Sequence, residues 1–294
     1  MRIAVLSRGI GLYSTQSIVE AGMGRGHEMW VMDYMQCNFI LETNQLKLYY
    51  DEREITGLDA VIPRIGASFT TEGASVIRQF EGLGVYSLLS SQSLVKTRDK
   101  LHCLQILAAK GLPVPKTVLA GQSDNLGLVL KKIGGPPYIV KIPESTHGVG
   151  VMLLDSEQGV ISVAETLEKL NQRVIIQEFI KEAEGADFRA IVVGGQVVAS
   201  MKRQAKEGEF RSNLHRGAFS VPASLTAQEE LLAKKATQIL GLNVAGVDML
   251  RSKNGPLILE INASPGLEGI ETTTRVDVAW SILLFLERAL RKKR

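Results

Sequence analysis

Near the start of the chain, short apolar runs alternate with stretches that have helical spacing. The apolar runs predict strands at 2–6, 28–33, 59–65 and 84–88, and the helical spacing predicts helices at 13–21 and about 71–82. A strand–helix–strand order of this kind builds an open α/β lobe. We therefore predict that residues 1–93 form a first domain.

The pattern changes in the second part of the chain. A helix is predicted over 96–110, where Gly111, Pro113 and Pro115 end it. Short strands then dominate, with two helices between them, which indicates α+β lobes and not a doubly wound sheet. We place a lobe with a phosphate loop at 94–186 and a C-terminal lobe with a metal site at 187–294. The predicted strands are 138–142, 150–154, 173–179, 187–193 and 196–202, and the helices are 157–170 and 226–240.

The strongest chemical signal is a predicted hairpin at 245–266. A three-residue loop of Lys253, Asn254 and Gly255 would place Asp248 across the ladder from Glu260, with Asn262 on the same face. Two carboxylates and an amide oxygen suit magnesium that bridges phosphates. The alternative is a solvated sheet edge, which would leave the charge of Glu260 inside the apolar run LILEI.

Other residues suit a nucleotide. Lys141 interrupts an apolar strand just before the small-residue loop 144–150, whose amides could bind phosphates. Lys100 is a second phosphate candidate, with a surface helix lysine as the alternative. The strand 174–180 could hold an adenine edge. Asp187 could accept from a ribose hydroxyl, or form an ion pair across the sheet with no ligand role.

A basic cluster follows in the segment 201–217. It contains Lys202, Arg203, Lys206, Arg211, His215 and Arg216. A solvated loop and a nucleic-acid patch are alternatives, but the single aromatic residue there argues against stacked bases. Arginines fit a transferring phosphoryl group and substrate carboxylates better. Arg8 and Arg64, at the ends of predicted strands, are candidate carboxylate clamps, or structural residues.

Composition narrows these possibilities. The 294 residues are 45% hydrophobic and 22% charged with a net charge of +3, which is typical of a globular protein and does not call for a nucleic-acid partner. The two cysteines form no CxxC pair, and no signal or membrane-spanning segment is evident, so we expect a cytoplasmic protein with reduced thiols. No P-loop motif occurs. Gly9, Gly11 and Asp33 approach a dinucleotide-binding pattern, but Ser14 stands at its third glycine.

Taken together, these motifs resemble the ATP-grasp fold, in which a Rossmann-like N-terminal lobe precedes two lobes that hold ATP. The match is closest to RimK-type ligases and covers nearly the whole chain. It is carried by the segments LSRGIGLYS, DAVIPRIGAS, TRDKLHCLQILA, RQAKEGEFRSNLHRG and GPLILEINASPGLEGIE.

The resemblance implies a set of site residues. ATP contacts are expected at Lys141, Glu178, Phe179, Asp187, Arg211, Ser212 and Asn213, and two magnesium or manganese ions at Asp248, Glu260 and Asn262. One branch of the superfamily carries an arginine where this chain has Gly246. Another cation must then stabilise the tetrahedral intermediate, and Arg203 and Arg216 are the candidates.

The same resemblance implies a function. RimK-type ligases add L-glutamate to the C-terminal glutamate of a small-subunit ribosomal protein through an acyl phosphate, and poly-glutamate synthesis is a possible extension. A glutamate ligase for a small-molecule coenzyme or carrier protein, or a non-catalytic ATP-binding regulator, would use similar residues. We also expect a homo-oligomer, with no membrane and no direct nucleic-acid contact.

Overall fold

The computed structural model describes residues 1–121, 125–142, 150–213 and 217–293. Its N-terminal lobe holds a parallel sheet in the order β2-β1-β6-β7, which confirms the predicted open α/β arrangement. The sheet strands are almost entirely apolar because helices cover them. The elements of this lobe are β1 (Arg2–Leu6), α1 (Tyr13–Gly24), β2 (Glu28–Met32), β6 (Ala60–Pro63), α2 (Thr70–Gly82) and β7 (Tyr86–Ser87).

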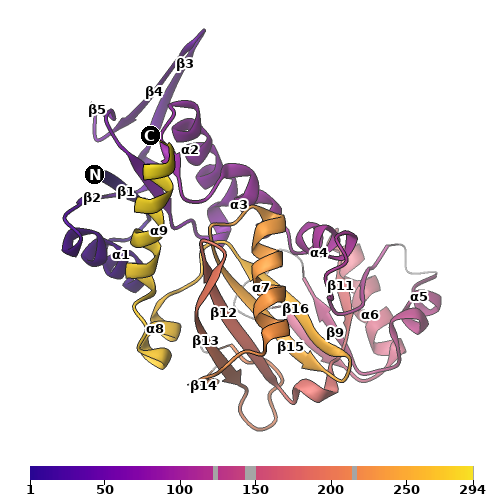
Figure 1. The fold of residues 1–294 in the computed structure, drawn as a ribbon. Coiled ribbons are helices and arrows are strands. Elements are labelled where there is room, and N and C mark those ends of the chain that lie inside the picture. Colours follow the sequence, from indigo (N-terminus) through magenta and orange to yellow (C-terminus); the bar gives the residue numbers. More distant parts are fainter. Residues whose placement is uncertain (122–124, 143–149, 214–216, 294) are drawn as a thin grey trace.

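A small antiparallel sheet that the sequence reading missed projects from this lobe (Figure 1). Asn44 turns the chain between its first two strands with a φ of 62°, a conformation that asparagine tolerates better than most residues. The strands are β3 (Asn38–Glu42), β4 (Gln45–Tyr50) and β5 (Arg53–Glu54).

The single helix predicted over 96–110 is wrong. The structure has two helices, α3 (Ser91–Arg98) and α4 (Lys100–Ala109), separated at Asp99. Asp99 adopts an extended backbone conformation, and its carboxylate accepts a 2.9 Å hydrogen bond from the amide of His102. An aspartate that caps the second helix in this way ends the first, because its own backbone leaves the helical conformation.

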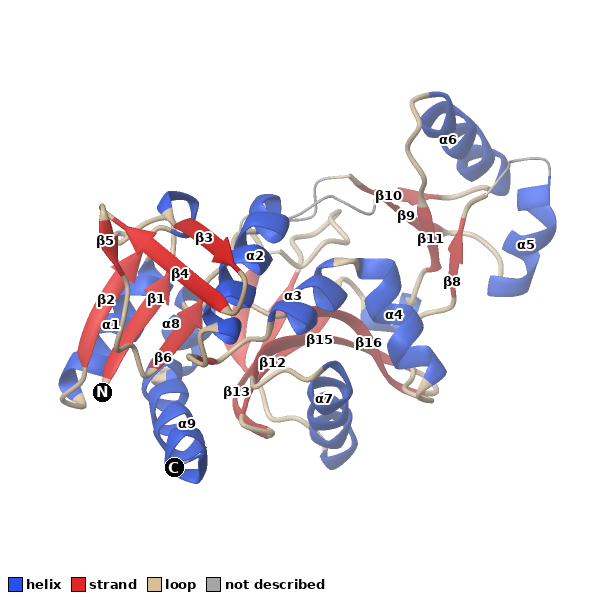
Figure 2. Cartoon of the chain, turned by 90° about the horizontal axis from the view of Figure 1, so that it is seen from above, coloured by secondary structure: helices blue, strands red, loops and turns tan. Residues whose placement is uncertain are grey.

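An antiparallel sheet in the order β10-β9-β11-β8 forms the next layer. Helices α5 (Leu126–Ile133) and α6 (Glu157–Lys169) lie on its outer side, away from the large sheet (Figure 2). Their apolar faces bury Tyr138 and Val140 in a separate core. The strands are β8 (Thr117–Leu119), β9 (Tyr138–Lys141), β10 (Val151–Leu154) and β11 (Ile175–Glu178).

The large sheet is antiparallel, in the order β14-β13-β12-β15-β16, and α7 (Ala227–Leu240) covers one of its faces. Val247 and Met249 pack with α7 in the main core. Since side chains alternate along a strand, Asp248 faces the opposite side of the sheet. The strands are β12 (Ala186–Val193), β13 (Gln196–Gln204), β14 (Phe219–Pro222), β15 (Val244–Ser252) and β16 (Gly255–Asn262).

The C-terminal helices pack against the N-terminal lobe. Helices α8 (Glu268–Thr274) and α9 (Val278–Lys293) follow the large sheet, and α9 packs beside α1 (Figure 1). Glu287 on α9 accepts hydrogen bonds from Arg25 at 2.7 Å and contacts His27 at 2.9 Å. None of the described helices is long and apolar enough to cross a membrane.

The predicted division at 93/94 and 186/187 stays a prediction. The first boundary falls inside α3, and the second falls between the first two residues of β12. Both elements run through these points without interruption.

Candidate active site

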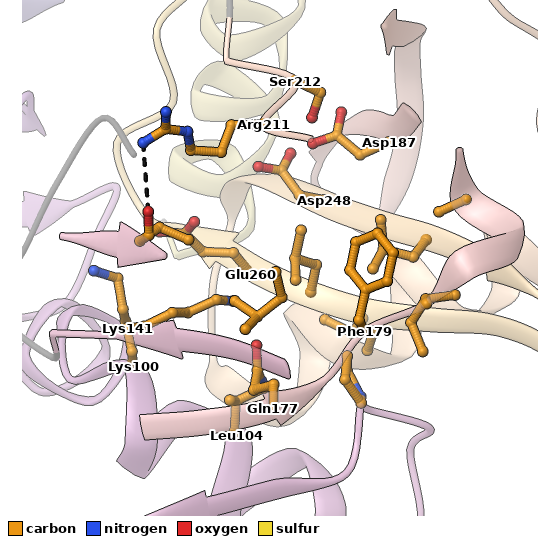
Figure 3. Close-up of a pocket in the computed structure, with 18 of the residues that line it drawn as sticks. Lys100, Leu104, Lys141, Gln177, Phe179, Asp187, Arg211, Ser212, Asp248 and Glu260 are labelled. Atoms are coloured by element: carbon orange, nitrogen blue, oxygen red, sulfur yellow. Dashed lines mark hydrogen bonds between the residues drawn. The ribbon is translucent and has the colours of Figure 1, made fainter. Parts of the chain in front are cut away.

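A deep pocket opens between the β8–β11 sheet and the exposed face of the large sheet. It encloses about 1380 Å³, including its open mouth. Its walls come from α4, β9, β11, β12 and the β15–β16 hairpin, so residues far apart in the sequence converge there (Figure 3). A pocket with apolar walls and a few convergent charged groups is typical of a nucleotide or substrate site.

The residues predicted for nucleotide binding all line this pocket, and so do three of the residues predicted for catalysis or metal binding. The nucleotide candidates are Lys100, Lys141, Glu178, Phe179, Asp187, Arg211, Ser212 and Asn213, and the others are Arg203, Asp248 and Glu260. Asn262 lies next to the wall residue Ile261, on the same strand. Arg216 and His215, and residues 144–149 of the predicted phosphate loop, lie outside the described residues.

The hairpin places Asp248 directly opposite Glu260, as predicted, but by a different route. The predicted three-residue loop is wrong: Ser252 pairs with Gly255, so only two residues form the turn. Met249 then pairs with Ile258. A bulge at Leu259 shifts the pairing by one residue, so that the next pair is Asp248 with Glu260. The bulge therefore does what the longer loop was expected to do.

Asp248 is the centre of a charge network across three strands. Its carboxylate accepts two 2.7 Å hydrogen bonds from Arg189 on β12, and Arg203 on β13 lies 2.9 Å away. Arg203 also donates two hydrogen bonds to Asp187, so both aspartates share one guanidinium. Burial alone would raise the pKa of Asp248, but Arg189 and Arg203 together hold it at about 2. Asp248 is thus ionised and preorganised.

This network shows how Asp187 and Arg203 are held, while their predicted roles toward ATP and the tetrahedral intermediate stay predictions. Asp187 forms the cross-strand ion pair, since it pairs with Arg203 in the sheet register, and Ser212 lies beside its carboxylate (Figure 3). Arg203 is only 4% exposed, with its guanidinium held between two carboxylates. The sequence analysis did not single out Arg189. Its place opposite Asp248 depends on how β12 pairs with β15, which the sequence pattern does not give.

Asp248, Glu260 and Asn262, here called the metal cradle, fit a divalent cation. Asp248 and Glu260 are opposite each other, and the side-chain nitrogen of Asn262 is buried without a hydrogen-bond partner. Rotation of that amide by half a turn presents its oxygen instead. The described residues contain no group of three or more histidine, cysteine, aspartate or glutamate side chains that could hold a metal. Two carboxylates and one amide suit magnesium, which keeps most of its coordination for water and phosphate.

Positive charge lines the pocket beside this cradle. Lys141 on β9 and Lys100 on α4 are half-buried in the wall (Figure 3). Burial lowers the pKa of Lys141 to about 8, with Lys100 adding to the effect and Glu260 opposing it. Burial also lowers the pKa of Lys100. Two lysines held close together at this depth would gain from a polyanion between them.

The strand end expected to hold an adenine is fixed by its neighbours. The Glu178 carboxylate accepts a 2.8 Å hydrogen bond from the Lys116 amide, and the Glu178 amide donates to the Lys116 carbonyl at 3.0 Å. Phe179 and Ile180 continue the pocket wall beyond β11. This places an apolar surface next to a polar strand end, the combination that a purine ring requires.

Arg211, from the segment after β13, lies at the pocket mouth. It donates hydrogen bonds of 2.9 and 2.7 Å to Glu209, and reaches the Val151 carbonyl at 3.4 Å (Figure 3). Arg211 therefore connects the two sheets that face each other across the pocket.

The two candidate carboxylate clamps differ. Arg8 lies 3.8 Å from Asp33 and stacks on Phe69, with 4.4 Å between the guanidinium carbon and the ring centre. Arg64 instead donates a 2.6 Å hydrogen bond to the Pro265 carbonyl, on the segment that follows the metal cradle. Burial lowers the pKa of Arg64 to about 10.

Comparison with known proteins agrees with this geometry. The RimK pre-ATP-grasp domain model matches residues 1–94, and the RimK-like ATP-grasp domain model matches residues 97–286. A protein of Thioalkalivibrio sulfidiphilus named probable alpha-L-glutamate ligase is 48% identical over 294 residues, covering 100% of this chain and 98% of the relative. One of the same name from Ectopseudomonas mendocina is 50% identical over 288 residues, covering 98% and 96%.

Solved structures share the fold at low identity. The ATP-grasp ligase PsnB, complexed with a phosphomimetic variant of its minimal precursor, Mg and ADP, has a TM-score of 0.75 and 21% identity, over 98% of this chain and 97% of its own. The macrocyclase MdnC of Microcystis aeruginosa, bound with its precursor peptide MdnA, has a TM-score of 0.72 and 15% identity, over 98% and 100%. The ATP-grasp fold implies the use of ATP and a divalent metal. This chain belongs to the RimK-like ATP-grasp family of ligases.

Proposed function

We propose that this protein joins L-glutamate to the C-terminal glutamate of an acceptor, with ATP hydrolysis to ADP and phosphate, and that the acceptor is the tail of a small-subunit ribosomal protein. The observation that carries the proposal is the pocket in which Lys100 and Lys141 face the paired carboxylates of Asp248 and Glu260. The names of the relatives support glutamate as the substrate.

In this proposal the pocket holds ATP along its length. Phe179 and the end of β11 lie against the purine, while Lys100 and Lys141 bind phosphate oxygens. Asp248, Glu260 and Asn262 would hold two magnesium or manganese ions, whose charge would offset that of the phosphates. Arg211, Ser212 and Asn213 at the mouth contact the nucleotide from the opposite sheet.

The proposed reaction has two steps. A carboxylate of the acceptor attacks the γ-phosphorus, ADP leaves, and an acyl phosphate forms. The glutamate amine attacks the acyl carbon, and phosphate leaves with the electron pair of the broken carbon–oxygen bond. Positive charge near this carbon stabilises the tetrahedral intermediate. Arg203 and Arg216 are proposed for this role; Arg203 would have to act from its position between Asp187 and Asp248.

Other acceptors, or a role without turnover, would use the same pocket. A small-molecule coenzyme or a carrier protein would use the same nucleotide and metal residues, and repeated addition would yield poly-glutamate. A regulator that binds ATP without turnover would also keep the pocket. We retain the homo-oligomer as a prediction.

Phosphate release measured with and without glutamate tests this function. Purified protein is incubated with ATP, magnesium and a peptide that ends in glutamate, while the peptide mass is followed. We expect glutamate-dependent phosphate release and stepwise mass gains of one glutamate residue. Glutamate-dependent release with an unchanged peptide would redirect the search to another acceptor, and tight ATP binding without any turnover would favour the regulator.

A further inference from the structure

Two arginines meet where the N-terminal lobe contacts the end of β16. Arg64 follows β6 and donates a 2.6 Å hydrogen bond to the Pro265 carbonyl. Arg98, the last residue of α3, donates to the carbonyl of Ile65, the residue next to Arg64. Each guanidinium donates to a neutral carbonyl, which does not offset its charge. The positive charges of the two arginines repel each other.

Neither arginine has an ion-pair partner among the residues that the structure describes. Their nearest acidic neighbours are Glu260 and Glu271, which interact with them at longer range. Glu271 already accepts hydrogen bonds from the amides of Val278 and Ala279, at 2.9 and 3.0 Å. Partly buried guanidiniums without a counter-charge are costly, so an arrangement that keeps two of them together suits an anionic ligand.

Three buried side-chain polar atoms without a hydrogen-bond partner in the described chain belong to residues at or next to this junction. They are Nε of Arg98, Nδ2 of Asn262 and Oγ of Ser264. Ser264 and Asn262 belong to the segment whose Pro265 carbonyl binds Arg64, and Arg98 lies against Arg64. Nε of Arg98 and Oγ of Ser264 can each donate a hydrogen bond, while Asn262 is assigned to the metal site. Two guanidiniums with no carboxylate paired to them among the described residues, beside an unpartnered hydroxyl, are complementary to a carboxylate.

We infer that Arg64, Arg98 and Ser264 form a binding site for a substrate carboxylate that is not itself phosphorylated. The inference rests on the proposed function, in which both the incoming amino acid and the acceptor carry such groups. Planar guanidiniums bind carboxylates through paired hydrogen bonds. The site adjoins Asn262 of the metal cradle, so a substrate held there has its reacting end near the phosphates.

Calorimetric titration with a non-hydrolysable ATP analogue and magnesium present tests this inference without requiring turnover. The ligands are L-glutamate and a glutamate-terminated peptide, each compared with the analogue whose α-carboxylate is an amide. The variants are Arg98→Gln and Ser264→Ala, with Arg78→Gln as a matched control, because Arg78 is exposed on α2. Thermal melting checks that each variant is folded.

We expect Arg98→Gln to weaken one carboxylate ligand by at least about tenfold, the loss of one charge-assisted hydrogen bond. Ser264→Ala should weaken the same ligand less, while the amide analogues and the nucleotide bind as before. The ligand affected identifies whether glutamate or the acceptor occupies the site. Equal weakening of nucleotide and carboxylate would reveal a structural role only and overturn the inference, as would unchanged binding in both variants.

Failure of the proposed function gives a different result. If the wild-type protein binds neither glutamate nor the peptide, a panel of small mono- and dicarboxylates replaces them. Arg98-dependent binding of one of these would keep the carboxylate site and remove glutamate as its ligand. Absence of binding across the panel would overturn the carboxylate site itself.

Discussion

The large sheet and the lobe junction both contain pairs of arginines, but the partners of these arginines differ. In the sheet, Arg189 and Arg203 are paired with Asp187 and Asp248 through short hydrogen bonds. At the junction, Arg64 and the neighbouring Arg98 donate to backbone carbonyls and form no ion pair with any residue that the structure describes. The paired network fixes the positions of its side chains before any ligand arrives. The unpaired arginines keep their hydrogen-bonding capacity for a ligand.

The two regions are therefore suited to ligands of opposite charge. Carboxylates held by arginine stay ionised and in place, as a cation site requires. Arginines left without carboxylates attract anions. Single substitutions in each region should therefore have different effects on activity and stability.

The largest effect is expected at the centre of the paired network. Asp248→Asn should lower ligase activity by about 100- to 1000-fold, because a charge in the metal cradle is lost. It should also lower the free energy of unfolding by about 3–5 kcal/mol, since Arg189 and Arg203 lose their shared partner. Activity assays and chemical denaturation measure the two effects.

Glu260→Gln is the matched comparison, because Glu260 forms no ion pair within the described residues. We expect a similar loss of activity with little change in unfolding free energy. If both variants lose stability equally, the network around Asp248 does not differ from the rest of the cradle.

Lys141 provides the next test, on the phosphate side. Lys141→Gln should weaken ADP binding by about 10- to 100-fold, the loss of a charge-assisted contact. Fluorescence or calorimetric titration measures the dissociation constant. Lys116→Gln is a suitable control, since Lys116 contributes its backbone to β11.

The same lysine predicts a pH dependence. Its pKa is lowered to about 8 from the ordinary 10.5, so the charged form that binds phosphate prevails below pH 8 and is lost as pH rises. ADP affinity without metal should therefore fall by up to about tenfold between pH 7 and pH 9. A protein carrying Lys141→Arg, which stays charged, should show a flatter profile. Equal slopes would mean that another group titrates.

The smallest effect on activity is expected far from the site. Glu287 joins α9 to Arg25 and His27, and these partners hold its pKa at about 2, below its ordinary value of 4.5. Its stabilising contribution is thus complete above pH 4.5 and is lost as pH falls through 2. Glu287→Gln should lower the free energy of unfolding at pH 7 by about 1–3 kcal/mol and leave nucleotide affinity unchanged.

The sequence predicted the parts of this molecule that depend on alternation along a strand. Asp248, Glu260 and Lys141 could be assigned because each interrupts an apolar run. The bulge at Leu259 could not, since nothing in the run LILEI distinguishes the extra residue. The register was therefore right while the loop length was wrong.

Long-range contacts explain the remaining gaps. Arg98 was predicted as part of a continuous helix, and its proximity to Arg64 depends on how α3 meets β6. Ser264 carries no signal of its own. Helix α9 and the β3–β4 hairpin were not predicted either, although the turn at Asn44 is a local signal for the hairpin.

Isotope transfer tests the central claim of an acyl-phosphate ligase most directly. A glutamate-terminated peptide with ¹⁸O in its terminal carboxylate is incubated with the protein, ATP, magnesium and glutamate, and the released phosphate is analysed by mass spectrometry. We predict one ¹⁸O atom in the phosphate released by the first addition to each peptide, because the labelled carboxylate oxygen that attacks phosphorus leaves with it; later additions activate the unlabelled carboxylate of the added glutamate. Peptide extension with unlabelled phosphate would contradict the account.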